Sequence, residues 1–394
     1  MRLRTLRKDA PLGGKRVLLR IDANVPVKKG RAVDGMFGRI AQVAVDIEWL
    51  LQKGARVILM THFGRPDGKR VSAYSVRPVA KRLSQLLNCK VPICREIVGE
   101  KAERAAARLP DGGVLLLENL RFDPREEKNS PSFAQALGRL ADMYVDDAFS
   151  VAHRSHASID AIADILPSYA GPRFAHEVEV LSRLMRAPKK PFVLCMGGLK
   201  LKTKLPMLKR LLPSVEVVLI GGALAHTFFA AKGLPLGASA FDEEGVTLAK
   251  ELIRTWGEKI QLPSDVVVAS SLREDARIRL GTPESIRHAE RIMDVGPETL
   301  KRYAESLSRA RTIVWNGPFG YCEREAFSAG TQAMARAIAD RIGEAFTVVG
   351  GGDTVPVIDG MGLFNKFSFV SMGGGAMLDF LSGDELPGVR VLMG

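Results

Sequence analysis

Arginine and histidine residues follow several short apolar runs in the first half of this chain. The runs are Val17–Ile21, Val57–Met60, Val114–Leu117 and Met143–Val145, and the polar residues at or near their ends include Arg20, Asp22, Asn24, Arg39, His62, Arg65, Arg121 and Arg154. Guanidinium groups bind phosphate and carboxylate through paired hydrogen bonds, and several of them repel one another unless an anion lies between them. The pattern predicts a site for a small, highly anionic ligand. We interpret Arg20 as structural, paired with Asp22 or a neighbouring carboxylate.

Apolar runs in the second half end mainly at glycine. Phe192–Met196 precedes Gly197 and Gly198, Val215–Ile220 precedes Gly221 and Gly222, Thr312–Trp315 precedes Asn316, Gly317 and Pro318, Phe346–Val349 precedes Gly350, Gly351 and Gly352, and Phe367–Ser371 leads to Gly373, Gly374 and Gly375. Glycine lets a ligand approach the backbone closely, and amides at a helix start bind phosphate. Several strand ends of this kind indicate a nucleotide-phosphate site.

The segment Gly350–Thr354 contributes most to this hypothesis. Asp353 offers a hard oxygen ligand for Mg²⁺, and Thr354 offers a hydroxyl for a phosphate oxygen. A glycine turn with a capping aspartate remains the alternative. Lys200 and Lys204 share one face if they are helical, although a solvated helix start would explain them too. Neither the Gly-x-x-x-x-Gly-Lys-[Ser/Thr] loop nor the Gly-x-Gly-x-x-Gly fingerprint occurs at these positions.

Strand-like runs alternate with helical patterns along the whole chain. The helical patterns are Gly38–Leu51, Val76–Leu87, Ser132–Leu140, Thr203–Leu212, Glu244–Trp256 and Ala329–Ile342. This alternation predicts an α/β protein with two doubly wound, Rossmann-like parallel-sheet domains joined by a hinge helix. We expect a first domain over 1–172, the hinge helix over 173–187, a second domain over 188–382 and a tail over 383–394. Ligands of such sheets bind at the carboxyl ends of the strands.

Composition narrows the classes of function. A chain of 394 residues is long enough for two domains, and its net charge of +13 fits an anionic ligand. Nucleic acid is a disfavoured partner, because the basic residues are scattered and only five Tyr and three Trp could stack on bases. The four cysteines suggest free thiols, and ordinary polar contacts suit His153 and His156 better than a metal. We expect a cytoplasmic protein with no membrane segment, since Val215–Ala231 is broken by glycines.

Two anion sites joined by a hinge suggest phosphoryl transfer after domain closure. Such transfer needs positioning and charge neutralisation more than a protein nucleophile, and no Ser-His-Asp or Cys-His arrangement stands out. A carboxylate acceptor would need no general base, and none is evident.

Short motifs in a fixed order identify a family. They are Arg16–Pro26, Thr61–Pro66, Glu118–Phe122, Asp147–Phe149, His153–Ser158, Gly197–Lys200, Trp315–Pro318, Gly350–Thr354 and Ser371–Ala376. With them the chain resembles phosphoglycerate kinase over essentially its full length. The resemblance implies a monomer that closes about its hinge and reversibly transfers a phosphoryl group, in line, between 1,3-bisphosphoglycerate with MgADP and 3-phosphoglycerate with MgATP.

The resemblance also implies roles for individual residues. Those implied to hold the phosphoglycerate are Asp22, Asn24, Arg39, His62, Arg65, Arg121 and Arg154. Those implied to hold the nucleotide are Gly198, Lys200, Lys204, Gly222, Asn316, Pro318, Glu323, Gly350, Gly351, Gly352, Asp353 and Thr354, with Glu323 on the ribose and Asp353 at Mg²⁺. Arg39, Lys200, Gly352 and Gly375 would act on the phosphoryl group in flight. The tail is expected to return to the first domain.

Departures from the family pattern border its adenine slot. Leu199, Ala223 and Tyr321 are each larger than the usual residue, which suggests a narrowed base pocket; neutral drift absorbed by backbone shifts is the rival explanation. Thr203, Met372 and Ser150 also differ from the pattern. A catalytically silent relative is disfavoured by the intact Arg39, Lys200 and Asp353, and a dehydrogenase by the missing dinucleotide fingerprint.

Overall fold

The computed structural model describes residues 2–7, 9–273 and 275–394. It divides into two compact units, Met1–Ser182 with Glu385–Gly394 (unit 1) and Arg183–Asp384 (unit 2). Each unit is built on its own six-stranded sheet. The prediction of two parallel-sheet domains is therefore confirmed.

The sheet of unit 1 has the order β5-β6-β4-β1-β7-β8, with all neighbours parallel. Its strands are β1 (Arg16–Ile21), β4 (Arg56–Met60), β5 (Ile93–Cys94), β6 (Val114–Leu117), β7 (Met143–Asp147) and β8 (Ser168–Ala170). The chain enters this sheet at β1 in its middle, passes through β4 to the edge strand β5, comes back to β6 between them, and then crosses to β7 on the other side of β1. The strand order thus reverses between β1 and β7, the place where open sheets bind ligands.

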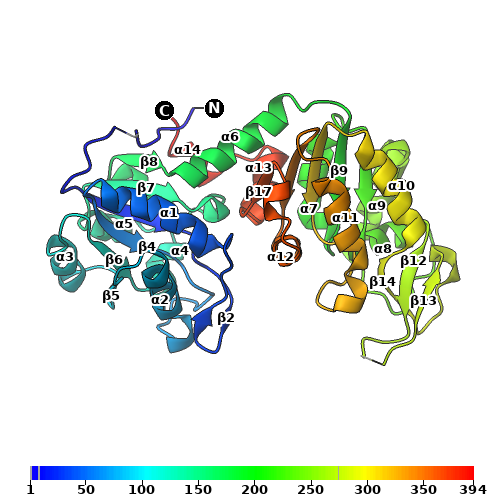
Figure 1. The fold of residues 1–394 in the computed structure, drawn as a ribbon, viewed down its shortest axis with the longest axis horizontal. Helices are drawn as coiled ribbons and strands as arrows, with labels where there is room; N and C mark the ends of the chain where they lie inside the picture. The colour runs from blue at the N-terminus through cyan, green and yellow to red at the C-terminus, as the bar shows by residue number, and fades with distance from the viewer. Residues whose placement is uncertain (1, 8, 274) are drawn as a thin grey trace. The chain divides into compact units, whose positions relative to one another are not determined.

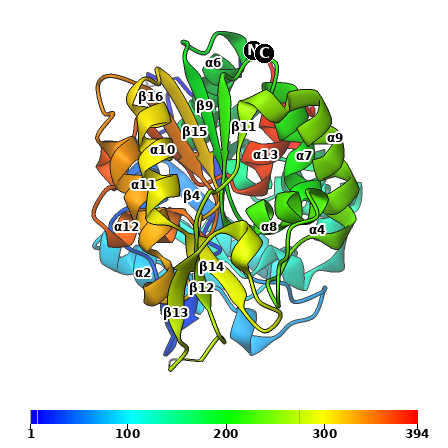
Figure 2. The same cartoon turned by 90° about the vertical axis from the view of Figure 1, so that its right-hand side faces the viewer.

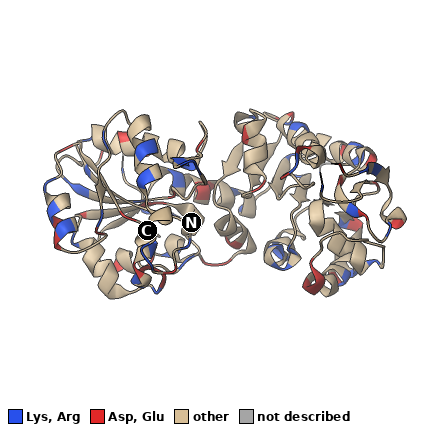
Figure 3. Ribbon diagram, turned by 90° about the horizontal axis from the view of Figure 1, so that it is seen from below, with Lys and Arg blue, Asp and Glu red and all other residues tan. Residues whose placement is uncertain are grey.

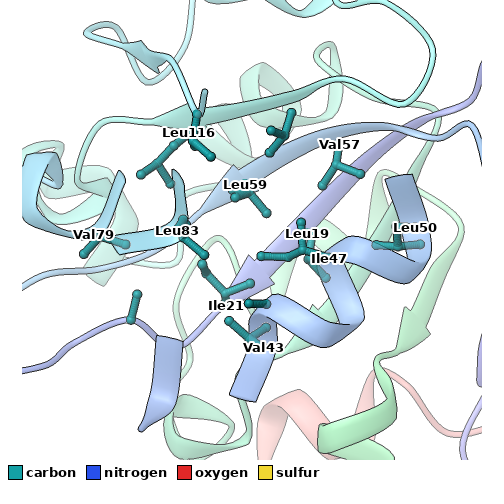
Figure 4. Packing of buried hydrophobic residues seen from close by; sticks show 14 of the residues in the cluster. Leu19, Ile21, Val43, Ile47, Leu50, Val57, Leu59, Val79, Leu83 and Leu116 are labelled. Carbon is teal, nitrogen blue, oxygen red and sulfur yellow. The ribbon is translucent and has the colours of Figure 1, made fainter. Parts of the chain in front are cut away.

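Helices cover both faces of this sheet (Figure 1), and alternating side chains of its buried strands pack against them. The helices of unit 1 are α1 (Arg39–Gln52), α2 (Arg77–Leu86), α3 (Glu100–Ala107), α4 (Pro124–Glu127), α5 (Pro131–Gly138) and the short α14 (Pro387–Arg390). Leu19 and Leu59 contact α1 and α2, where Val43, Ile47 and Leu83 complete the cluster (Figure 4). Leu18 and Ile58 face α3 and α5 instead. Because successive side chains of a strand point to opposite faces of the sheet, neighbouring residues pack against different helices.

The sheet of unit 2 has the order β11-β10-β9-β15-β16-β17, again parallel. Its strands are β9 (Phe192–Met196), β10 (Val217–Ile220), β11 (Ile260–Gln261), β15 (Thr312–Asn316), β16 (Phe346–Gly350) and β17 (Phe369–Ser371). Figure 2 shows α10 (Pro297–Ser308) and α11 (Ala329–Ala339) on one side, and α7 (Leu201–Leu211), α8 (Gly222–Ala231) and α9 (Val246–Trp256) on the other. The helices α12 (Val355–Gly360) and α13 (Gly375–Ser382) follow β16 and β17. The strand order reverses between β9 and β15.

An antiparallel sheet of three strands extends unit 2. It has the order β13-β12-β14, formed by β12 (Val266–Ala269), β13 (Ile278–Gly281) and β14 (Arg291–Val295). In unit 1, β2 (Val27–Lys28) and β3 (Arg31–Ala32) form a short exposed hairpin. The strands predicted from the sequence include neither this hairpin nor the antiparallel sheet of unit 2.

Two segments connect the units along the chain. Helix α6 (Pro172–Arg186) belongs to unit 1 as far as Ser182 and to unit 2 from Arg183. The last ten residues, Glu385–Gly394, leave unit 2 and join unit 1, where the Gly388 amide donates to the Ala152 carbonyl at 2.9 Å. No described helix has the length and apolar character needed to cross a membrane.

Candidate active site

Asp22 connects three segments of unit 1 just beyond the end of β1. Its Oδ2 accepts hydrogen bonds from the guanidinium of Arg39, at the start of α1, and from Ser150 Oγ, which lies 2.5 Å away. Its Oδ1 accepts from the Asn24 amide at 3.1 Å. Asn24 Oδ1 in turn accepts from the Gly64 amide, which follows β4. The carboxylate therefore holds Arg39 in place at the edge of the sheet.

His62 lies deeper, with 5% of its surface exposed. Its Nδ1 is 3.1 Å from Nη2 of the fully buried Arg20. Burial lowers the pKa of His62 well below its ordinary value, and the charges of Arg20, Arg121 and Arg39 lower it further. A guanidinium only donates hydrogen bonds, so Nδ1 of this neutral ring must be the acceptor. The hydrogen is then on Nε2, which makes His62 a hydrogen-bond donor without positive charge.

Arg121 comes from a single 3-10 turn after β6, where Asn119 Oδ1 accepts from the Arg121 amide at 3.1 Å. Its guanidinium donates to the Gly64 carbonyl at 2.9 Å and forms an ion pair with Glu127 at 2.9 Å. Burial lowers the pKa of Arg121; Glu127 opposes this effect, whereas Arg20 and Arg154 add to it. Positive charge is thus concentrated here beyond what the carboxylates neutralise.

All the predicted anion-binding residues of unit 1 follow the carboxyl ends of its strands, but some are buried or half-buried and others are exposed. Arg39 and Arg121 both act electrostatically on His62, and Arg154 acts on Arg121. Arg65 and Arg154 are exposed. Arg20 does not pair with Asp22: it donates to Ser158 Oγ and the Ile21 carbonyl and contacts His62. The predicted pairing with Asp22 is therefore wrong: the Arg20 side chain is fully buried and bonds to groups beneath the site instead.

Strand register aligns the glycine ends in unit 2. Met196 pairs with Asn316, and Asn316 pairs with Gly350. The residues after these strands therefore meet at one edge. A Cβ on Gly222 would lie 2.6 Å from the Pro318 carbonyl oxygen and 3.0 Å from the Gly198 amide nitrogen. Glycine is required there because the backbones themselves are in contact.

Lys204 reaches this edge from the first turn of α7 and is only 8% exposed. Its ammonium group donates to Asn316 Oδ1, and Asn316 Nδ2 donates to the Gly350 carbonyl at 3.2 Å. Burial lowers the pKa of Lys204 to about 8, while the charge of Asp353 raises it. The solvated-helix alternative is wrong for Lys204, because α7 directs it into the protein. Lys200, the N-cap of α7, is exposed.

A cavity of about 670 Å³ opens beside these residues in unit 2, a size suited to a nucleotide. Six of the predicted nucleotide-binding residues line it: Gly198, Gly222, Pro318, Glu323, Gly352 and Asp353. Leu199, Ala223 and Tyr321 line it too. The other six, Lys200, Lys204, Asn316, Gly350, Gly351 and Thr354, do not line it. Thr354 is fully buried, and its Oγ1 accepts from the Gly317 amide at 3.1 Å.

The surroundings of Asp353 suit an Mg²⁺ ion that is coordinated mainly by the phosphates of a bound nucleotide and only partly by the protein. Asp353 is exposed, lines the cavity and is close enough to Lys204 to affect its pKa. Among the described residues, no group of three or more His, Cys, Asp or Glu is arranged to hold a metal by itself. Mg²⁺ is commonly bound through one or two carboxylates together with substrate phosphates and water, and Asp353 supplies an exposed carboxylate for this purpose.

Sequence reasoning missed several residues that support the sites. Ser150 was noted only as unusual, yet it donates to Asp22. Glu126 is fully buried behind the arginines and bonds to Ser158, the last residue of the motif that begins at His153. Lys and Arg are spread over the helices of both units (Figure 3), so charge alone did not single out either site.

Known proteins resemble this chain throughout its length. The family model described as phosphoglycerate kinase matches residues 7–384. Phosphoglycerate kinase of Moorella thermoacetica is 46% identical, covering 98% of both chains, and that of Thermomicrobium roseum is 44% identical, covering 99% of both. The structure of phosphoglycerate kinase from Pyrococcus horikoshii is 33% identical with a TM-score of 0.88, covering 98% of both chains. That from Coxiella burnetii is 39% identical with a TM-score of 0.83, covering 98% of this chain and 97% of the other.

Proposed function

Because the chain belongs to the phosphoglycerate kinase family, we propose that unit 1 holds the phosphoglycerate and unit 2 holds the nucleotide. The chain is a phosphotransferase of glycolysis with a carboxyl group as acceptor. It passes a phosphoryl group between 1,3-bisphosphoglycerate with ADP and 3-phosphoglycerate with ATP. The observation that carries the division of roles is that arginines and His62 follow the strands of unit 1, whereas glycines, Lys204 and Asp353 follow the strands of unit 2 beside a cavity of about 670 Å³.

In unit 1, the proposed phosphoglycerate site consists of Asp22, Asn24, Arg39, His62, Arg65, Arg121 and Arg154. The guanidinium groups supply paired donors and positive charge to phosphate and carboxylate. Neutral His62 adds an Nε2–H donor. Because its Nδ1 faces Arg20, His62 is poorly placed to remove a proton as a general base. A carboxylate acceptor fits this arrangement, since it attacks without losing a proton.

In unit 2, the proposed nucleotide site places the base and ribose in the cavity, with Glu323 on the ribose hydroxyls. Lys200 and Lys204 neutralise phosphate charge, and the amides of Gly352 and Gly375 donate to the phosphoryl oxygens. Asp353 would hold Mg²⁺, which when bound neutralises part of the charge on the nucleotide phosphates. Arg39 and Lys200 would stabilise the charge that develops on the phosphoryl group during in-line transfer.

The proposed transfer follows closure of the two units about α6. In the direction of ATP synthesis, the bond between phosphorus and the acyl oxygen breaks, and a bond forms to a terminal oxygen of ADP. The carboxylate leaves as an anion, so no protein group has to exchange a proton. We further propose that the enzyme acts as a monomer. We also propose that it acts in the cytoplasm, since relatives from Triticum aestivum and Arabidopsis thaliana are named cytosolic.

Titration calorimetry with each substrate alone tests the division of roles. Arg121→Ala should weaken 3-phosphoglycerate binding about tenfold or more, since a charged hydrogen bond contributes roughly 1.5–3 kcal/mol, and leave MgADP binding unchanged. Lys204→Met should do the reverse. If Arg121→Ala weakened MgADP binding instead, the assignment of substrates to units would be wrong.

A further inference from the structure

We propose that a buried chain of hydrogen bonds, formed by Glu126, Ser158 and Arg20, positions His62 as a donor to the anionic substrate. In this role the three residues are positioning residues, because they act through His62 and lie beneath the site. The inference rests on the proposed function, which places phosphoglycerate at His62.

The chain is continuous from the interior to the site. Ser158 Oγ is 2.6 Å from Glu126 Oε1, and the Ser158 amide donates to Glu126 Oε2 at 3.0 Å. Arg20 Nε donates to Ser158 Oγ at 3.1 Å, and Arg20 Nη2 is 3.1 Å from His62 Nδ1. Arg20, Ser158 and Glu126 have 0% exposure, and His62 has 5%. Bulk solvent therefore has almost no access to these hydrogen bonds.

Each link has one direction. An ionised carboxylate only accepts, so the Ser158 hydrogen points to Glu126 and the Ser158 lone pairs remain for Arg20. Arg20 only donates, so His62 Nδ1 accepts and Nε2 carries the hydrogen. Burial raises the pKa of Glu126, while Arg20 and the bonds from Ser158 oppose that rise. The titratable groups that act on His62 are Arg20, Arg121, Arg39 and His156, and all of them disfavour a positive imidazole; burial lowers the pKa of His156 itself to about 3.

A purely structural role does not account for where the chain ends. Burying a charged pair is often no more stabilising than burying apolar residues of similar volume. Here the buried charges lead to the one imidazole among the proposed phosphoglycerate ligands and fix its tautomer. Second-shell partners fix histidine tautomers in the same way at metal sites.

Two variants break the chain at residues that are not themselves proposed ligands of the phosphoglycerate. Ser158→Ala removes the hydroxyl that joins Glu126 to Arg20, and Glu126→Gln removes the charge at the buried end. Ser168→Ala is the matched control, because Ser168 is also a buried serine of unit 1, at 2% exposure, but bonds to the Leu166 carbonyl. His62→Ala identifies the imidazole signals of His62 in long-range ¹H–¹⁵N NMR spectra and measures what His62 itself contributes.

In the parent enzyme and in Ser168→Ala, we expect His62 as a single Nε2–H tautomer. Ser158→Ala and Glu126→Gln should give a tautomer mixture and raise KM for 3-phosphoglycerate about 3- to 10-fold, as expected for one lost hydrogen bond. KM for MgATP should be unchanged and kcat within about twofold, because the lost bond serves substrate binding.

An unchanged His62 tautomer in both variants, or an equal rise of KM in Ser168→Ala, would overturn the inference. If His62→Ala raises KM but neither chain variant does, the inference fails and the proposed function stands. If His62→Ala leaves KM unchanged, the proposed phosphoglycerate site is wrong and the inference falls with it.

Discussion

Burial sets the protonation of two side chains that lie deep in the proposed sites. His62 is neutral because it is buried among arginines, and Lys204 has its pKa lowered to about 8 by burial. A neutral imidazole can donate a hydrogen bond to an anion without the energetic cost of burying a positive charge. A lysine that titrates near pH 8 makes nucleotide binding sensitive to pH.

The affinity for MgADP should fall as pH rises through about 8, because Lys204 loses the charge that attracts the phosphates. About pH 9 we expect binding roughly fivefold to tenfold weaker than about pH 7, since one pKa unit corresponds to a tenfold difference. The loss is not unfolding: a lysine with a lowered folded pKa holds its proton less tightly when folded, so this group favours the folded state more above about pH 8. Titration calorimetry across this range measures the effect, and Lys204→Met should flatten it. Equal slopes for both proteins would contradict the assignment.

Leu199 and Ala223 are larger than the residues usual in the family, and this difference predicts a tight pocket for the nucleotide base. Ala223→Gly should lower KM for ADP more than Leu199→Ala, because Leu199 is 42% exposed and can move away. Excess bulk in a packed site costs about 1–3 kcal/mol, so the double variant should improve KM for ADP, GDP and IDP together by roughly fivefold or more. Steady-state kinetics with the three nucleotides provide the measurement. Unchanged constants would favour neutral drift.

Residue types at strand ends could be predicted from sequence, but their partners could not. Asp22 and Arg39 are 17 positions apart, and their pairing depends on how α1 begins beside β1. The contact between Arg20 and His62 spans 42 positions and needs the register of β1 with β4. Such contacts arise from tertiary packing, which local pattern does not encode.

Glycines at element ends serve two different purposes in unit 2. Gly317 has φ +93°, and a Cβ there would collide with the Gly197 carbonyl. Gly352 has no atom within 4 Å of an added Cβ. The first glycine is needed by the fold, and the second leaves room for a ligand.

Alanine at these two positions should separate folding from binding. Gly317→Ala should destabilise the protein by about 1–3 kcal/mol through strain. Gly352→Ala should leave thermal stability nearly unchanged but lower kcat/KM for MgATP about tenfold or more, as one lost oxyanion donor costs at least that much. Gly360→Ala, also at an open position, is the control. Thermal denaturation and kinetics give both readouts; a Gly352→Ala enzyme of full activity would exclude its role.

All nine strands predicted from apolar runs are present, whereas the strands missed were short or antiparallel. β5 and β11 have two residues each, too few for a recognisable pattern. In β13, Ile278 and Leu280 are about half exposed, so its alternation does not mark a buried face. Parallel central strands are buried on both faces and therefore read as continuous apolar runs.

At the scale of the whole molecule, the end of the chain completes the first unit. Leu386, Val389 and Leu392 are buried within unit 1, and Arg390 forms an ion pair with Asp160 at 2.9 Å. Unit 1 therefore cannot finish folding until residues beyond unit 2 are available.

Deletion of Glu385–Gly394 should destabilise unit 1 by about 5 kcal/mol, since each buried aliphatic side chain contributes roughly 1.5–3 kcal/mol. Calorimetry should show a lower transition for unit 1 and little change for unit 2. Met393→Ala is the control, because Met393 is 46% exposed. Arg390→Ala should cost at most about 1 kcal/mol, as its ion pair is partly exposed. A deletion variant as stable as the parent would show that the tail is dispensable.

The most direct test of the account is turnover of 3-phosphoglycerate with MgATP, followed by trapping of the acyl phosphate. The parent enzyme should form acyl phosphate, and Arg39→Ala should lose about 100-fold or more in kcat, as for removal of a donor that stabilises transition-state charge. KM for MgATP should not change, because Arg39 belongs to unit 1. No acyl phosphate from the parent enzyme, or an Arg39→Ala variant of full activity, would contradict it.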